Sequence, residues 1–259
     1  MLRKTILAAA LGATPAAASD CFQYAQAPGQ VWNASFTELE DAQVGLRFVG
    51  HSSWMLVTHE GLTILTDWSG DYAWKIEDVT ADVVTMNHAH ETHWTPNPDP
   101  AIEHVLKGWG SGGKPAEHEL YLGETLIRNV PTDIRSYGGE PFGNSIFVFE
   151  HGGLCIGHLG HLHHEPTEEQ YAMIGRLDVV MAPVDGSFTL PVDRMVDVME
   201  RLKARVVLPM HAFGALGLGR FLAGMEEGGF EVEMLAGDTL VLSAKTLPEV
   251  PTVMVPKGL

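Results

Sequence analysis

The sequence has few basic residues: 16 Lys and Arg stand against 33 Asp and Glu in 259 residues, for a formal net charge of −17. Such a charge repels the phosphate backbone of nucleic acids and anionic lipid head groups. We therefore expect a small-molecule substrate and no nucleic-acid partner. Beyond its N-terminus the sequence also lacks the run of about 20 apolar residues that a membrane-spanning helix needs, so we expect no membrane insertion. Neither absence indicates an oligomeric state.

Cysteine is also scarce, with only Cys21 and Cys155. Two cysteines are too few for a disulfide-rich scaffold. They can form one disulfide if the chain is exported to an oxidising compartment, but the sequence does not reveal the distance between them. One disulfide and two free thiols therefore both remain open.

The first eighteen residues predict export. Residues 1–4 form a short basic segment, and residues 5–12 form an apolar segment that is too short to span a bilayer. Ala16-Ala17-Ala18 offers the small residues that a signal peptidase recognises. We predict a signal peptide over residues 1–18, cleaved before Ser19, and a periplasmic or secreted bacterial protein. The alternative is a buried N-terminal helix.

The rest of the chain predicts a single α/β domain over residues 43–245. An N-terminal segment, 19–42, precedes it, and an irregular C-terminal tail, 246–259, follows it. Short apolar runs bounded by turn residues predict strands at 44–49, 54–58, 62–66, 82–86, 126–130, 145–150, 154–157, 178–182 and 205–208.

Two further segments complete the secondary structure. From Pro191 to Leu202, apolar residues recur at helical spacing and predict a helix. Residues 94–119 are rich in Pro and Gly and predict a long loop around a short helix at 101–107. We expect Trp94 and Trp109 in that loop to provide apolar contacts beside a functional site.

Six of the thirteen histidines fall into three blocks with metal-ligand spacing, namely His88, His90 and His93, then His158 and His161, then His211. On an extended segment, His88 and His90 point the same way and can bind one ion. His158 and His211 each close a predicted strand, and ligands of α/β sheets gather beyond strand ends. Since imidazole is the commonest metal ligand, we predict a metal centre. Scattered surface histidines are the alternative.

These blocks resemble a known family. The segment from His88 to His93 is similar to the His-x-His-x-Asp-His signature of the metallo-β-lactamase superfamily. Five further segments resemble motifs of its ascorbate-6-phosphate-lactonase-like branch: Gly50-His51-Ser52-Ser53, Leu65-Thr66-Asp67, Gly143-Asn144-Ser145, His158-Leu159-Gly160 and Pro209-Met210-His211. The resemblance covers about residues 44–243. It implies an αββα sandwich of two mixed sheets with a zinc-type centre at one edge.

The resemblance also implies roles for single residues. One metal site would comprise His88, His90 and His158, and the other would use His93 and His211. Asp67 would orient a ligand histidine. His51 would lie near the mouth of the cavity, or would be a hydrogen-bonded turn residue.

Two residues depart from the family pattern. Thr92 stands where the signature has aspartate, and His161 stands where an aspartate bridges two metals. An imidazole nitrogen cannot bridge two ions as a carboxylate does. We therefore expect fewer than two tightly bound ions, with one at His88, His90 and His158 and a weak or empty position near His93, His161 and His211. All-nitrogen ligation favours zinc, with copper, nickel or iron as the other candidates.

The expected function is that of an exported metal-dependent hydrolase. A metal-bound hydroxide would attack a small ester, lactone, amide or phosphodiester. The catalytic candidates besides the ligands are His51, Asp67 and Glu91, with Glu165 as another possible base. One alternative is a non-catalytic metal-binding protein, which would bind metal without turnover. Another is a copper or iron redox variant of the fold, which would show colour or a paramagnetic signal.

Overall fold

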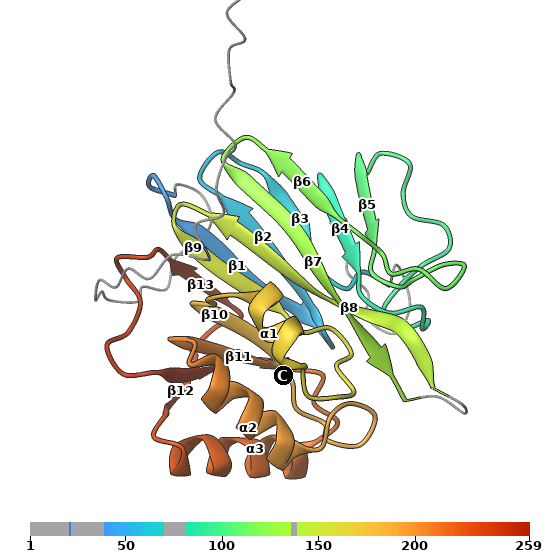
Figure 1. The fold of residues 1–259 in the computed structure, drawn as a ribbon. Coiled ribbons are helices and arrows are strands. Elements are labelled where there is room, and N and C mark those ends of the chain that lie inside the picture. The colour runs from blue at the N-terminus through green and yellow to red at the C-terminus, as the bar shows by residue number, and fades with distance from the viewer. Residues whose placement is uncertain (1–20, 22–38, 70–80, 136–138) are drawn as a thin grey trace, which may run out of the picture.

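Two β-sheets face each other in the computed structural model, which describes residues 21, 39–69, 81–135 and 139–259 (Figure 1). The predicted signal peptide lies outside the described residues. Strand order in the first sheet is β13-β1-β2-β3-β4-β5, and in the second it is β12-β14-β11-β10-β9-β8-β7-β6. Both sheets mix parallel and antiparallel pairs, which confirms the predicted sandwich of two mixed sheets.

The first three strands of the six-stranded sheet in chain order pair antiparallel and match strands that the sequence predicts. Its members are β1 (Val44–Gly50), β2 (Ser53–Thr58), β3 (Thr63–Leu65), β4 (Val83–Met86), β5 (His104–Lys107) and β13 (Thr239–Leu242). Strands β3, β4 and β5 pair in parallel. All four residues of β4 are buried, as expected for a parallel strand inside a sandwich. The carboxyl ends of β3 and β4 therefore lie at the same edge.

The eight-stranded sheet consists of an antiparallel half followed by a parallel half. Its strands are β6 (Glu119–Leu122), β7 (Thr125–Ile134), β8 (Glu140–His151), β9 (Leu154–His158), β10 (Val179–Pro183), β11 (Val206–Met210), β14 (Thr252–Val255) and β12 (Glu231–Met234). Strands β9, β10 and β11 run in parallel. Their carboxyl ends consequently share one edge.

Side-chain alternation along these strands divides the core into two layers. Val179 and Met181 of β10 pack against the six-stranded sheet, in one cluster with Trp54 and Leu56. Val180, their neighbour on the same strand, faces the opposite way, into a cluster with the helices. That helical layer contains α1 (Glu168–Ile174), α2 (Val192–Leu202) and α3 (Ala215–Glu227), on the outer side of the larger sheet (Figure 1). The helix predicted from Pro191 is confirmed, with Pro191 as its N-cap.

Two local predictions are wrong. The helix expected at 101–107 does not form: residues 104–107 are strand β5 and residues 101–103 are irregular, because pairing with β4 outweighs the weak local preference of seven residues. The irregular tail expected from residue 246 contains β14, which is buried and pairs with both β11 and β12. Pro251 and Pro256 flank this strand without interrupting it, so they do not prevent it from joining the sheet.

Helix α3 was not predicted, because its glycines lower helix propensity by about 1 kcal/mol each. Two of them serve packing instead. A Cβ on Gly224 would lie 2.9 Å from a methyl of Val196 on α2, and one on Gly217 would lie 3.0 Å from the carbonyl oxygen of Val184. Glycine thus allows α3 to approach α2 and the loop after β10.

A disulfide joins Cys21 to Cys155, with the Cα atoms 5.6 Å apart and a sequence separation of 134. It decides between the two outcomes that the sequence left open. Cys155 lies in β9, and the backbone carbonyl of Cys21 accepts the N–H of Arg176. Cys21 is therefore attached to the centre of the larger sheet. Among the described helices, we find none with the length and hydrophobicity of a membrane span.

Candidate metal centre

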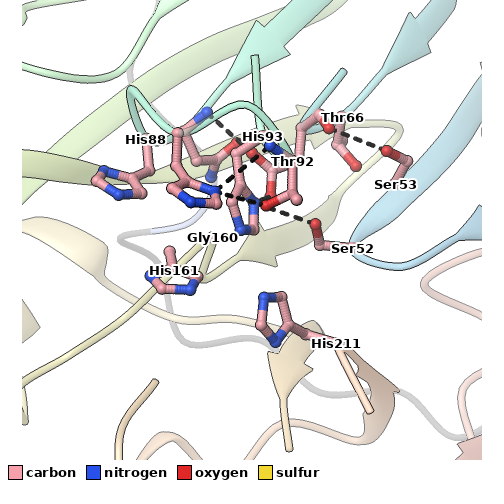
Figure 2. A network of polar contacts seen from close by, with 12 residues as sticks. Ser52, Ser53, Thr66, His88, Thr92, His93, Gly160, His161 and His211 are labelled. Atoms are coloured by element: carbon pink, nitrogen blue, oxygen red, sulfur yellow. Dashed lines mark hydrogen bonds and ion pairs between the residues drawn. The ribbon is translucent and has the colours of Figure 1, made fainter. Parts of the chain in front are cut away.

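Histidines from both sheets meet at the shared carboxyl-terminal edge. His88, His90 and His93 follow β4, His158 ends β9, His161 lies in the turn beyond it, and His211 follows β11. Figure 2 shows His93, His161 and His211 projecting into one space from three separate segments. Their ring centroids lie 4.6 Å (His93–His161), 5.2 Å (His93–His211) and 5.0 Å (His161–His211) apart. The fold thus brings all three predicted blocks together.

His93 is oriented by Asp67. Its Nδ1 lies 2.5 Å from Asp67 Oδ2 and 3.2 Å from Ser52 Oγ, and the side chains of His93 and Asp67 are fully buried. Because the carboxylate accepts the Nδ1 proton, the lone pair of His93 is on Nε2. That nitrogen is buried and has no hydrogen-bond partner among the described residues. A buried lone pair held in this way is suited to a metal ion.

His211 is oriented by a second carboxylate, which the sequence analysis missed. Asp185 Oδ1 lies 3.0 Å from His211 Nδ1, and their side chains are 0% and 2% exposed. Asp185 follows β10 as Asp67 follows β3. The available signal was an aspartate just beyond a predicted buried strand, whereas the role of Asp67 was implied by the family resemblance.

His51 completes a compact group of three. Its ring centroid lies 4.2 Å from that of His211 and 5.2 Å from that of His93. Its Nε2 is buried and unpartnered within the described chain. One ligand atom from each of His51, His93 and His211 lies within 4.8 Å of the other two. These donors fit a single ion with nitrogen ligands.

The backbone is strained at this group. His51, Asp67 and His211 have φ angles of 52°, 51° and 55°, a region that costs a non-glycine residue on the order of 1–3 kcal/mol. The backbone N–H of His211 donates to the carbonyl of His51 at 2.7 Å, which joins two of the strained positions. Strain of this kind concentrates at functional sites.

The two aspartates are held as anions. Burial alone would raise the pKa of Asp67, but the interactions with His93 and His158 and a hydrogen bond from Ser52 outweigh it and hold that pKa below its usual range. Burial likewise opposes ionisation of Asp185, and hydrogen bonds from His211, Thr189 and Ser187 lower its pKa. Burial, together with His211 and His93, lowers the pKa of His51 to about 3. The site thus combines two carboxylates with a neutral His51, a charge state suited to a divalent cation.

His88 and His90 lie beside this group. The Nδ1 of His88 donates to the carbonyl of Gly143 at 2.8 Å, so its Nε2 keeps a lone pair. His90 is exposed, its ring is parallel to that of His88 with centroids 6.1 Å apart, and its Nδ1 lies 2.9 Å from Thr92 Oγ1. Neither belongs to the compact group of three.

His161 adjoins the group with a hydrogen-bonded partner. The backbone N–H of Arg135 donates to His163 Nδ1 at 2.7 Å, so a neutral His163 carries its proton on Nε2. That Nε2 lies 2.7 Å from His161 Nδ1, which must accept. A neutral His161 therefore carries its proton on Nε2. Burial and neighbouring histidines lower the pKa of His161, and burial and Arg135 lower that of His163 to about 4.

His158 links three chain segments through hydrogen bonds. Its Nε2 donates to the carbonyl of Ser52 at 2.7 Å, and its Nδ1 accepts from Asn87 Nδ2 and from the N–H of Gly160, both at 3.1 Å. Both ring nitrogens are thus used by the protein. In this arrangement His158 offers no lone pair to an ion.

The two glutamates considered as bases differ in setting. Glu91 is exposed on the turn between His90 and Thr92. Glu165 forms an ion pair with Arg194 of α2. Trp94 and Trp109 are in edge-to-face contact, with centroids 5.3 Å apart, and are partly buried against the cluster formed by Leu65, Val84 and Met86.

Comparison with known proteins shows which family the chain belongs to. The model of the beta-lactamase superfamily domain matches residues 45–211. A UPF0173 metal-dependent hydrolase of Thermococcus onnurineus is 25% identical over 195 residues, covering 65% of this chain and 84% of that protein. One from Carboxydothermus hydrogenoformans is 25% identical over 192 residues, covering 64% and 83%.

Solved structures agree. A Thermotoga maritima protein, assigned to the metallo-beta-lactamase superfamily as a zinc-dependent hydrolase, superposes with a TM-score of 0.61 at 28% identity, over 82% of this chain and 98% of its own. CmlA of Streptomyces venezuelae, a diiron beta-hydroxylase, has a TM-score of 0.51 at 14% identity, over 79% and 55%, and is similar in fold alone. Since the family match spans more than half of the chain, this protein belongs to the metallo-beta-lactamase superfamily.

Proposed function

We propose that the protein is a metal-dependent hydrolase whose principal ion is held by His51, His93 and His211. The observation that carries this proposal is the pair of buried Nε2 atoms, on His51 and His93, that lack partners in the described chain. A buried polar atom without a partner costs about 1–3 kcal/mol, and an ion removes that cost. The names of the relatives, metal-dependent hydrolases, support the same reaction class.

The substrate is a small ester, lactone, amide or phosphodiester. When bound, the ion would polarise the substrate carbonyl or phosphoryl group and acidify a water molecule. Asp67 and Asp185 keep the Nε2 lone pairs of His93 and His211 turned toward it. The Nε2–H of His161, beside both rings, can donate a hydrogen bond to an oxygen on which negative charge develops.

Zinc is the proposed metal, in a single tight site. Three imidazoles with an open fourth position form a known catalytic zinc arrangement, and nitrogen donors disfavour manganese or magnesium. His88 and His90 would provide at most a weaker second position, because they lie outside the compact group. Copper or iron chemistry is the competing candidate, since the fold itself houses a diiron enzyme in CmlA.

Export to the periplasm or the exterior is part of the proposal. The Cys21–Cys155 disulfide supports it, because disulfides persist in oxidising compartments and are rare in the cytosol. Intact-mass analysis of the exported protein tests the idea. A chain that begins at Ser19 is expected, and one that retains residues 1–18 would contradict the predicted cleavage.

The decisive test of function combines metal analysis with turnover. Protein purified without added metal should contain about one zinc per chain and hydrolyse members of a panel of esters, lactones and phosphodiesters. A chelator should abolish this activity and zinc should restore it. Metal without turnover would favour a binding protein, and colour with a paramagnetic signal would favour redox chemistry.

A further inference from the structure

An apolar rim lies directly beside the candidate metal centre. We define it as Phe188 and Phe213, whose relative exposures are 64% and 59%. Phe188 and Phe213 are in edge-to-face contact with centroids 5.6 Å apart. Single exposed apolar residues are common, but two large exposed rings in contact are a feature of interaction sites.

The rim is continuous with the centre. The ring of Phe213 lies 4.8 Å from that of His211 and 5.6 Å from that of His51, centroid to centroid. A group bound at the ion would therefore have an aromatic surface at its side. Phe213 lies against two of the three proposed ligands, so the rim is adjacent to the position where the substrate would react.

The other ring of the rim is attached to the same centre through Asp185. Besides His211, this carboxylate accepts the backbone N–H of Phe188 at 2.6 Å and the hydroxyl of Thr189 at 2.5 Å. The residue that orients a proposed ligand thus also fixes the turn that presents Phe188 to solvent. Covering two large exposed rings with an apolar group is favourable, and their position beside the centre puts such a group next to the ion.

We propose that the rim binds an apolar alkyl or aryl group of the substrate, adjacent to the bond that is hydrolysed. This inference rests on the proposed function and specifies its substrate class: esters, lactones or amides with a hydrophobic substituent. Phe188 and Phe213 are specificity-determining residues that contact this substituent. Burial of each ring by substrate should change kcat/KM by about tenfold.

The test uses zinc-loaded protein and two measurements. The first is kcat/KM for p-nitrophenyl acetate, butyrate and octanoate. We expect it to rise with acyl length in the unmodified protein and to become nearly flat in the double variant Phe188→Ala, Phe213→Ala, mainly through KM. Tyr121→Ala, at another exposed aromatic on the distant edge strand β6, is the matched control and should keep the rise.

The second measurement is calorimetric binding of 4-phenylbutyrate against acetate, which needs no turnover. The unmodified protein should prefer 4-phenylbutyrate by about tenfold or more, and the double variant should lose that preference while retaining its circular dichroism. Preference for 4-phenylbutyrate without hydrolysis of any substrate would refute the proposed function and support the rim. Hydrolysis that is indifferent to acyl length, with equal binding of both acids, would refute the rim alone. A dimer that the double substitution converts to monomer in sedimentation velocity would identify the rim as a subunit interface and overturn the inference.

Discussion

The carboxylate of Asp185 lies 3.0 Å from Nδ1 of His211, and the geometry repeats that of Asp67 with His93 on the other sheet. Each aspartate stands just beyond a buried strand and directs the opposite nitrogen of its histidine into the shared space. Two sheets therefore contribute one carboxylate–histidine pair each. This duplication makes the centre depend on the packing of the two sheets, and not on one loop.

Asp185→Asn should weaken zinc binding by about 10–100-fold, because an amide that donates to His211 Nδ1 would leave the ring in the wrong tautomer. The dissociation constant, measured by competition with a chromophoric chelator, checks this. Asp193→Asn, at an exposed residue on α2 that pairs with Arg220, is the control and should bind zinc normally. An unchanged constant in Asp185→Asn would exclude Asp185 from positioning the ligand.

Two double variants decide which histidines hold the principal ion. His93→Ala with His211→Ala should lose the tightly bound zinc, because two of the three compact donors are removed. His88→Ala with His90→Ala should retain it, since these rings lie outside that group. Elemental analysis after dialysis against a mild chelator measures both. The reverse result would restore the site expected from the family resemblance at His88 and His90.

The sequence predicted which segments meet at the centre better than it predicted the role of each histidine there. All three histidine blocks meet, because each follows a strand whose apolar run was readable locally. The role of His158 was not readable, since it depends on Asn87 and the Ser52 carbonyl, which come from distant segments. The rim was missed for a similar reason. Phe188 and Phe213 look like core residues in the sequence, and only the fold shows that they are exposed.

The same distinction applies to the fold. Strands with continuous apolar runs, such as β4 and β10, were predicted because their burial on both faces is visible in the sequence. Strand β5 is only partly buried and lies in the Pro- and Gly-rich stretch 94–119, so its conformation follows from its pairing with β4. Strand β14 is a buried apolar run of four residues, but the prolines on either side of it favoured the prediction of an irregular tail.

Gly160 should tolerate no side chain. Its φ is 60°, and a Cβ would lie 2.5 Å from Asn144 Oδ1 and 2.6 Å from atoms of Asn87, the residues that bond His161 and His158. Gly160→Ala should therefore lower the free energy of unfolding by about 1–3 kcal/mol more than Gly112→Ala. Gly112 has a φ of 62° but nothing within 4 Å, so it isolates the backbone cost. Equal losses in urea denaturation would show that the turn can relax.

Removal of the disulfide should cost stability. The 134-residue separation of Cys21 and Cys155 predicts a loss of roughly 4–5 kcal/mol in the free energy of unfolding, since the cross-link restricts the unfolded chain. Cys21→Ser with Cys155→Ser, compared with the oxidised protein in urea, measures it. Reduction of the unmodified protein with dithiothreitol should reproduce the loss. If neither treatment shifts the midpoint, the link does not contribute to folding stability.

Metal-free protein should lose stability as the pH falls from 6.5 toward 4.5. Burial lowers the folded-state pKa of His51, His88, His151, His158, His161 and His163 below the ordinary value of 6.5. Below pH 6.5 the unfolded chain binds protons that the folded chain does not, so stability is greatest above that pH. Each fully buried histidine contributes a slope of up to about 1.4 kcal/mol per pH unit, and a partly exposed one contributes less.

Asp67 and Asp185 do not add to the loss of stability between pH 6.5 and 4.5. The folded-state pKa values of Asp67 and Asp185 are lowered, so their contribution is present above about pH 3.9 and is lost only as the pH falls below it. Urea midpoints at pH 7.5, 6.0 and 5.0, with chelator present, measure the histidine effect. His151→Asn removes one buried histidine at Thr125, away from the metal centre, and should reduce the slope in part. A midpoint that stays constant from pH 7.5 to 5.0 would mean that these histidines can take up protons without leaving the folded state.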